Sequence, residues 1–271
     1  MKSGKWDTRI CRAEELASTY PFAAEGLHFY QRVAEFQKSL YAQMEKERGK
    51  EKGTLLAGSL REALDIPHLL PHFASFLSVM EKSAPAPLSH SARELCACGA
   101  GRWREILTEW WDSGADRGPK LTPAEALISW AFLQPCAEYL ADHAEPTQPE
   151  GTPSHCPVCG RLPLVGVLRP EGNGARRSLV CSLCSTEWNF RRMVCPACGE
   201  EDEKKHAVYT AEEFSHVRVE ACTSCRRYIK TVDLAKNGHA VPVVDELATI
   251  PLNLWAAENG YAKLQPNLLG I

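Results

Sequence analysis

The chain has 271 residues, 44% of them hydrophobic and 24% charged, and a formal net charge of −3. That apolar content can bury a substantial core, and the length favours about two domains. Residues 1–150 carry 17 Lys and Arg against 21 Asp and Glu, whereas residues 151–271 carry 14 against 13. Neither half is basic enough to predict nucleic-acid binding from charge alone.

The first residues contain no continuous apolar segment of the kind found in signal sequences. No later run approaches the ~20 apolar residues that a membrane helix needs. We therefore expect a cytoplasmic protein that does not insert into a membrane. Because thiols stay reduced in the cytoplasm, the 12 cysteines favour metal binding or catalysis over a disulfide framework.

The first half of the chain is predicted to be helical. Apolar residues recur at steps of three and four, which predicts a helix from about Phe22 to Glu47 with one stripe facing a core. The members of this stripe are Phe29, Val33, Phe36, Leu40 and Met44. Prolines and glycines separate further predicted helices near residues 60–64, 69–82, 89–98 and 102–112.

The clearest helix start is TPAE at residues 122–125, where Thr caps, Pro suits the first turn and Glu completes a capping box. This helix is expected to run to about Ala141. After it, the segment from Glu145 to His155 holds three prolines and one glycine, and we place a domain boundary there.

Beyond this boundary the sequence predicts hairpins. Short β-rich segments, separated by turn residues, read LPLVGVLR, RSLVCSLC, KHAVYTAEE and HVRVEAC. A helix is expected to return over residues 247–263.

Four Cys-x-x-Cys pairs dominate the second half of the chain. They are Cys156 and Cys159, Cys181 and Cys184, Cys195 and Cys198, and Cys222 and Cys225. The gaps between successive pairs are 21, 10 and 23 residues. A hairpin across each long gap brings two cysteine knuckles together as one tetrahedral thiolate site. We therefore predict one metal site from the first two pairs and a second from the last two, with a crossed pairing as the alternative.

Other uses of these pairs fit less well. Redox dithiols would need a βαβ context, which is missing, and covalent haem attachment would need a His directly after the second cysteine. Both first knuckles end in glycine, Gly160 and Gly199, which allows the backbone to turn with amides facing the thiolates. Both sites look closed to water, so we expect no catalytic residue and no organic cofactor.

The other candidate ligands are interpreted as structural. Four cysteines fall in predicted helices, where a free thiol is usually a small buried hydrophobe. They are Cys11, Cys96, Cys98 and Cys136. His68 and His72 are one helical turn apart, but no carboxylate partner is evident for a metal site. His155 adjoins Cys156 and is expected at most to support that ligand.

Several cations adjoin the knuckles and would offset the formal −2 charge of a divalent metal held by four thiolates. The residues are Arg191, Arg192, Arg226, Arg227 and Lys230. Ordinary solvated charge and a partner-binding surface are both consistent with this pattern.

The stretches CPVCG, LVCSLCSTEWNFRRMVCPACG, VEACTSCRRYIKTVD and PVVDELATIPLNLWAAENGY resemble the formate dehydrogenase accessory protein FdhE family. The resemblance covers most of residues 153–263, whereas the helical half agrees only in character. Beside the knuckles it rests on TEW at residues 186–188, YIK at 228–230 and DELAT at 245–249. The chain departs at Asn189, where the family often has His, and at Asn253, where Asp is common.

The resemblance implies a multidomain α+β protein, with an all-α domain (1–150) followed by two small rubredoxin-like or zinc-ribbon-like β domains (151–192 and 193–271). The last of these would end in a helix. It further implies two mononuclear metal ions, iron with zinc as the alternative, because both accept tetrahedral thiolates. We expect metal to hold the β half together while the helical half folds without it.

The function implied by the resemblance is that of a cytoplasmic, non-enzymatic assembly factor, a chaperone that binds the catalytic subunit of a formate dehydrogenase before membrane delivery. Two other functions stay open from the residues alone. One is a zinc-ribbon nucleic-acid-binding protein, supported by paired arginines but opposed by the near-neutral charge. The other is a rubredoxin-like redox protein.

Overall fold

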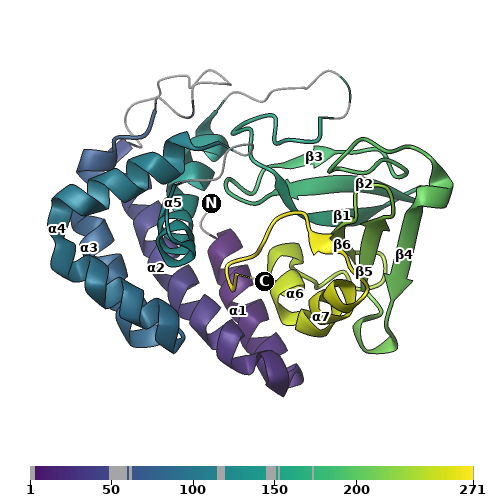
Figure 1. The fold of residues 1–271 in the computed structure, drawn as a ribbon, viewed down its shortest axis with the longest axis horizontal. Helices are drawn as coiled ribbons and strands as arrows, with labels where there is room; N and C mark the ends of the chain where they lie inside the picture. Colours follow the sequence, from purple (N-terminus) through teal and green to yellow (C-terminus); the bar gives the residue numbers. More distant parts are fainter. Residues whose placement is uncertain are drawn as a thin grey trace.

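The computed structural model describes residues 4–48, 60, 63–114, 120–144, 151, 153–172 and 174–270. In this part of the chain a helical half is followed by a mixed sheet (Figure 1). The helices of the first half are α1 (Gly4–Thr19), α2 (Ala24–Arg48), α3 (Ile66–Ser83), α4 (Ala86–Asp112) and α5 (Pro123–His143), with the 3-10 turn η1 (Pro21–Ala23) after α1. The helical character predicted for the first half is confirmed.

The local signals for α2 and α5 act as predicted. The N–H of Glu125 donates to Oγ1 of Thr122 at 3.2 Å, and the N–H of Thr122 donates to the Glu125 carboxylate at 3.0 Å, which completes the capping box of α5. Along α2 the predicted stripe is buried except for Phe36, which is half-buried against the same core.

Other helices differ from the prediction. The expected helices at 89–98 and 102–112 share the label α4, but the non-helical backbone of Gly99 (φ 77°, ψ 179°) divides it between them as predicted. In the expected helix at 60–64, residues 61 and 62 lie outside the described residues, and Leu60 and Ala63 lie in turns. No bounds were predicted for helix α1, although Cys11 was expected in a helix, because two buried arginines, Arg9 and Arg12, interrupt its apolar face.

The second half forms one sheet with the strand order β3-β2-β1-β6-β5-β4. Its strands are β1 (Pro163–Glu171), β2 (Gly174–Cys181), β3 (Glu187–Asn189), β4 (His206–Thr210), β5 (Val217–Cys222), β6 (Arg227–Asp233) and β7 (Ala262–Lys263). The turns η2 (Glu203–Lys205) and η3 (Glu212–Phe214) flank β4. The predicted hairpins are present as the antiparallel pairs β1–β2 and β4–β5, and β6 adds to β5.

Strand β6 joins the two hairpins, because it pairs with β5 on one side and in parallel with β1 on the other, which the cysteine spacing did not predict. Gly166 faces Thr231 across this junction. A Cβ at position 166 would collide with the Thr231 side chain, so the close approach of the strands requires glycine there. Most of the predicted boundary segment, residues 145–155, lies outside the described residues, and the domain limits stay a prediction.

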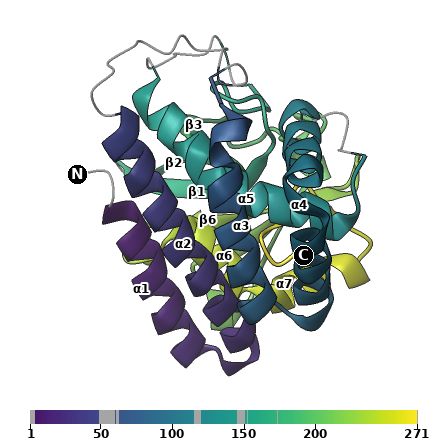
Figure 2. The same ribbon diagram turned by 90° about the vertical axis from the view of Figure 1, so that its left-hand side faces the viewer.

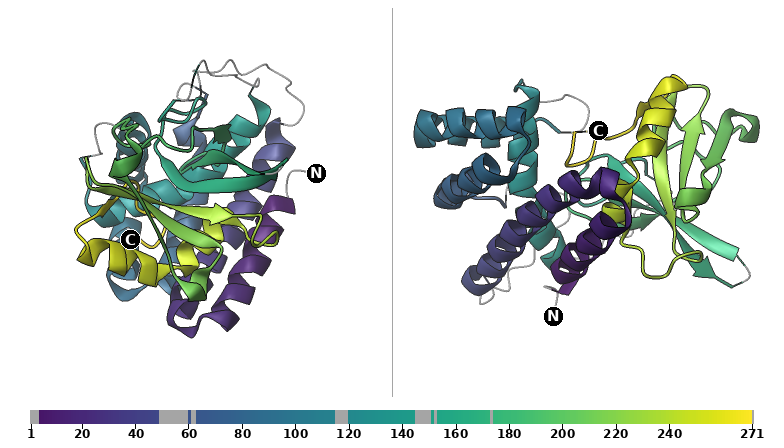
Figure 3. Two further views of the ribbon diagram at one scale, coloured as in Figure 1. Left: turned by 90° about the vertical axis from the view of Figure 1, so that its right-hand side faces the viewer. Right: turned by 90° about the horizontal axis from the view of Figure 1, so that it is seen from below.

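The C-terminal helix is divided. Helix α6 (Pro242–Ala248) and helix α7 (Ile250–Glu258) are separated at Thr249, where a single helix over 247–263 was expected. Helix α6 contacts α1 on one side and strands β1 and β6 on the other. It therefore lies between the two halves of the molecule, as Figure 3 shows.

The main hydrophobic core crosses the boundary between the two halves. One cluster includes Phe73 and Phe132 from the helices together with Cys156, Cys181 and Cys184 from the first cysteine group. A second, smaller cluster lies between the sheet and α7, and it includes Val217, Val232, Ala256 and Tyr261. The helices α1 to α5 and the sheet behind them are seen in Figure 2. Within the described ranges, no helix has the length and hydropathy needed to cross a bilayer.

Candidate metal centres

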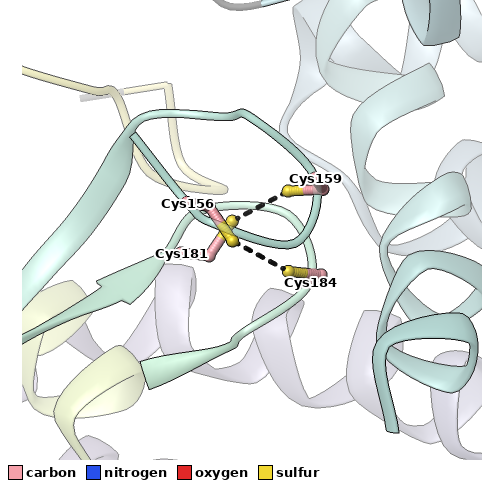
Figure 4. A group of neighbouring side chains, drawn as sticks. All are labelled: Cys156, Cys159, Cys181 and Cys184. Carbon is pink, nitrogen blue, oxygen red and sulfur yellow. Dashed lines mark hydrogen bonds between the residues drawn. The ribbon is translucent and has the colours of Figure 1, made fainter. Parts of the chain in front are cut away.

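The eight cysteines of the four pairs form two groups. Within each group the four sulfur atoms lie within 4.8 Å of one another. The first group joins the first two pairs, Cys156, Cys159, Cys181 and Cys184 (Figure 4), and the second joins Cys195, Cys198, Cys222 and Cys225. The structure thus groups the pairs in sequential order, as predicted, and not in the crossed order that was the alternative. Strands span the long gap within each group.

The sulfur separations fit a metal ion. Four sulfurs at about 2.3 Å from a central ion in a tetrahedron stand about 3.8 Å from one another. In the second group, Cys195 and Cys225 are 3.8 Å apart, as are Cys198 and Cys222. In the first group the corresponding separations are 3.5 and 3.3 Å, for Cys156 with Cys184 and Cys159 with Cys181. Both donor sets suit iron or zinc.

The glycines of the first knuckles turn the chain as predicted. Gly160 and Gly199 have φ values of 72° and 74°, a region that favours glycine. Their N–H groups donate to the carbonyls of Cys156 and Cys195 at 2.9 Å, which closes each turn. The amides that reach sulfur belong to other residues: the N–H of Leu183 lies 3.3 Å from the Cys181 sulfur, for example.

The second knuckles make the same turn without glycine. Ser185 has φ 54° and Arg226 has φ 59°, which costs about 1–3 kcal/mol for residues with a Cβ. Contacts elsewhere hold both in place. Ser185 donates to Glu138, and Arg226 donates to the carbonyl of Asn259 at 2.6 Å while its guanidinium lies 4.2 Å from the ring centroid of Tyr261.

The electrostatics of the first group call for a cation. Hydrogen bonds from the thiols of Cys159, Cys181 and Cys184 hold the pKa of Cys156 well below its ordinary value. Burial raises the pKa of Cys181, and the hydrogen bond to Cys156 raises that of Cys184. These opposite shifts show that buried thiolates in close contact disfavour one another's ionisation. Four thiolates can coexist in this buried space only around a positive ion.

The two groups differ in their surroundings. The first is covered by the helical half: Trp130 Nε1 and Gln134 Nε2 of α5 donate to the carbonyl of Ser182 at 3.1 and 3.4 Å. Arg161, next to the first knuckle, donates to the carbonyl of Trp110 at 2.7 Å. In the second group Cys198 is exposed and Cys225 is half-buried, so this group lies at the surface.

The TEW triplet braces the first group. Thr186 Oγ1 lies 3.1 Å from the Cys184 sulfur, and Trp188 Nε1 donates to the carbonyl of Pro153 at 2.9 Å. Glu187 accepts two hydrogen bonds from Arg169, at 2.7 and 2.6 Å. Of the two positions that depart from the resemblance, Asn189 is exposed, whereas Asn253 is buried and accepts a hydrogen bond from the Tyr228 hydroxyl at 3.1 Å.

Residues that were not predicted join α1 to α5 and to the C-terminal helix α6. Arg9 of α1 donates to Glu138 of α5 at 2.8 Å, and both side chains are buried. Arg12, one helical turn further, binds both carboxylate oxygens of Asp245 at 3.0 and 2.6 Å. Burial opposes ionisation of Asp245, but hydrogen bonds from His216 and Arg12 outweigh it and lower its pKa. The only sequence signal for these contacts was the spacing of Arg9 and Arg12, which are three residues apart and therefore lie on one face of a helix.

One predicted surface cation is in the core. Lys230 is fully buried and pairs with Glu246 at 2.8 Å, so the expectation of either solvated charge or partner binding is wrong for this residue. The DELAT segment makes this burial possible, because it supplies the hydrogen-bond partners of the ammonium group. Lys230 donates to the Glu246 carbonyl at 2.5 Å and to the Thr249 hydroxyl. Arg191 is exposed and pairs with Glu201 at 2.6 Å.

The remaining candidates lie outside both groups. Cys136 is buried and Cys96 half-buried, but Cys11 and Cys98 are exposed, so the expectation of burial fails for these two because they lie on the outer faces of their helices. His68 Nε2 lies 3.2 Å from Glu47, a carboxylate partner that was not foreseen. His155 Nδ1 lies 3.1 Å from the hydroxyl of Ser154.

The fold and the two groups define a protein in which an all-helical half adjoins a sheet bearing two four-cysteine groups that could hold two metal ions. Two family models match in succession: "FdhE, central domain" over residues 155–192 and "FdhE, C-terminal domain" over residues 193–269. The chain belongs to the FdhE family.

Relatives and a solved structure agree with this assignment. A "Protein FdhE homolog" of Aquifex aeolicus is 24% identical over 96% of this chain and 93% of its own length. Homologues of the same name from Haemophilus influenzae and Pseudomonas aeruginosa are 30% and 38% identical, over 75% and 42% of this chain and 63% and 38% of their own lengths. The crystal structure of the FdhE protein from Pseudomonas aeruginosa has the same fold, with a TM-score of 0.72 at 24% identity over 98% of this chain and 96% of that one.

Proposed function

We propose that this protein is a non-catalytic assembly factor that binds the catalytic subunit of a formate dehydrogenase in the cytoplasm, before that enzyme reaches the membrane. The observation that carries the proposal is the pair of closed four-cysteine groups in a chain of the FdhE family. The identity of the client rests on the family resemblance of the sequence.

The absence of catalysis is part of the proposal. When each of four thiolates occupies a tetrahedral position, the bound ion has no open position for water or substrate. Two mononuclear ions, iron with zinc as the alternative, would therefore have a structural role and would hold the hairpins together. A structural site of this kind stabilises a fold by about 10 kcal/mol, comparable with the stability of a whole domain. Elemental analysis of anaerobically purified protein distinguishes the metals.

The functional test is a gene deletion followed by a measurement of formate-dependent respiration. Wild-type protein is expected to restore the activity, and Cys195→Ser and Cys222→Ser are expected to restore less of it. Cys11→Ser is the matched control, because Cys11 is an exposed thiol in α1 outside both groups. Undiminished activity in the deletion strain, together with no recovery of the catalytic subunit on tagged wild-type protein, would refute the proposal.

Electron transfer at the second group is a second candidate function. It is favoured by the exposure of Cys198, because a ligand sulfur at the surface brings a redox partner close to the ion. The test is a redox titration of the iron-loaded protein followed by visible absorbance. A reversible change that Cys198→Ser removes would support this function, and an unchanged spectrum across the titration would exclude it.

A further inference from the structure

Strand β4 forms an open edge of the sheet. It is the last strand in the order and pairs with β5, and in the described part of the chain no strand pairs with its outer side. Figure 1 shows β4 at the rim of the molecule, away from the helical half. An open edge presents unpaired N–H and C=O groups to which an extended segment of another chain can add.

A cleft lies over the sheet beside this edge strand. It has a volume of about 170 Å³ and is lined by residues of β4, β5 and β6 and by residues 192–197, which include Cys195 of the second cysteine group. Val208 of β4 and Met193 line it, with exposed fractions of 54% and 40%. In the described residues only two other large apolar side chains, Phe22 and Leu254, are as exposed. These two exposed apolar side chains line one cleft and together form a small apolar patch, which suits contact with an apolar group of a partner.

The charge of the cleft is positive. Arg177 and Arg218 both pair with Glu220, at 2.7 and 2.5 Å, so these three residues carry one net positive charge. Arg192 and Arg227 also line the cleft, and among the described residues neither pairs with a carboxylate. The acidic residues 200–203 precede β4 in sequence, but none of them lines the cleft. A carboxylate is therefore the complementary group.

We infer that an extended segment of the client protein docks in this cleft alongside β4, with an acidic side chain at Arg192 and Arg227 and an apolar side chain on Met193 and Val208. This inference rests on the proposed function and names the surface that binds the client. A protein segment fits better than single-stranded nucleic acid, because no exposed aromatic ring lines the cleft to stack a base.

The second cysteine group forms part of this surface. Cys195 and Cys222 line the cleft, so the position of Met193 relative to β4 depends on the geometry of that group. Loss of the ion from the second group would therefore change the cleft, whereas the first group lies under the helices and does not line it. Client binding is expected to follow occupancy of the second group.

The test measures binding of a purified catalytic subunit of formate dehydrogenase to immobilised full-length protein. Val208→Glu, Met193→Glu and Arg192→Glu are each expected to raise Kd by about tenfold or more, as for central interface residues. Leu254→Glu is the matched control and is expected to leave Kd unchanged, because Leu254 is 60% exposed but lies on α7 outside the cleft. Metal content is measured for every variant to confirm folding.

The outcomes separate this inference from the function on which it rests. If wild-type protein does not bind the subunit, the proposed function fails. If wild-type protein binds and the three cleft variants bind equally well, the docking surface is wrong. Equal weakening by Leu254→Glu would also overturn it.

A photo-crosslinking amino acid at position 208 supplies a direct readout. The crosslinked client peptide is expected to contain Asp or Glu beside an apolar residue, whereas the same amino acid at position 254 is expected to give no such product. A client peptide without an acidic residue would contradict the inference. A second contradicting outcome uses labelled single-stranded RNA. The inference would be wrong if Arg192→Glu abolished RNA binding but left client binding unchanged.

Discussion

The hydroxyl of Ser185, the residue that follows the last cysteine of the first group, donates a 2.8 Å hydrogen bond to Oε1 of Glu138 in α5. Arg9 of α1 donates to both partners, at 2.8 Å to Glu138 and 3.1 Å to Ser185. A turn of the metal centre and two helices therefore share one buried ionic contact. Because the main core also crosses this boundary, we expect the helical half and the first group to unfold together, and this replaces the expectation from the sequence that the helical half folds without metal.

Glu138→Gln is expected to lower the free energy of unfolding by about 3–5 kcal/mol, because it leaves the buried Arg9 guanidinium without a counter-charge. Ser185→Ala removes one hydrogen bond and is expected to cost about 1 kcal/mol. Urea unfolding of the metal-loaded protein measures both. Equal effects of the two variants would show that the charge of Glu138 is unimportant.

A chelator is expected to remove the two ions in two phases, with the second group first, because Cys198 is exposed while the first group is covered by α5. The release is followed with a coloured metal indicator. Cys198→Ser should abolish the fast phase and Cys181→Ser the slow one. A single phase in wild-type protein, or a fast phase that survives Cys198→Ser, would contradict this order.

Acid is expected to destabilise the C-terminal segment through Glu246. Burial opposes its ionisation, but the charges of Lys230 and Lys263 outweigh burial and lower its pKa to about 2 from 4.5. Between these values the unfolded chain binds a proton that the folded chain does not. The stabilisation is therefore complete above pH 4.5 and is lost as the pH falls to about 2, which amounts to about 3 kcal/mol.

The measurement is the free energy of unfolding against pH. Glu246→Gln is expected to be less stable at neutral pH, because Lys230 loses its buried partner, and to lose less stability on acidification. The slope from other carboxylates, such as Asp245, remains in this variant. An unchanged acid slope in Glu246→Gln would count against the assignment.

The kink in α4 gives a matched pair of glycine substitutions. Gly99 has φ 77°, so Gly99→Ala is expected to cost about 1–3 kcal/mol, although an added Cβ would have open space. Gly101→Ala, in the helix two residues later and with equal space, is expected to stabilise by about 1 kcal/mol. Thermal unfolding compares them. Stabilisation by both substitutions would mean that α4 is straight.

The sequence alone determined the features that depend on neighbours along the chain. The capping box at Thr122 and Glu125, the stripe of α2 and the turns at Gly160 and Gly199 are set by local hydrogen bonds and by allowed φ values. The grouping of the cysteines was also predictable, because a Cys-x-x-Cys knuckle is local and each long gap forms a hairpin, β1–β2 or β4–β5, that brings two knuckles together.

Only the tertiary structure decided what is buried and what is open. From the sequence, Lys230 was interpreted as a surface cation. In the structure it lies in β6 and is buried against the DELAT helix α6, where it pairs with Glu246. Arg9 and Arg12 made α1 look polar, yet they pair with Glu138 and Asp245, residues more than a hundred positions away. The burial of one cysteine group and the exposure of the other follow from the same long-range packing, because desolvation depends on every element that covers a group rather than on its neighbours in sequence.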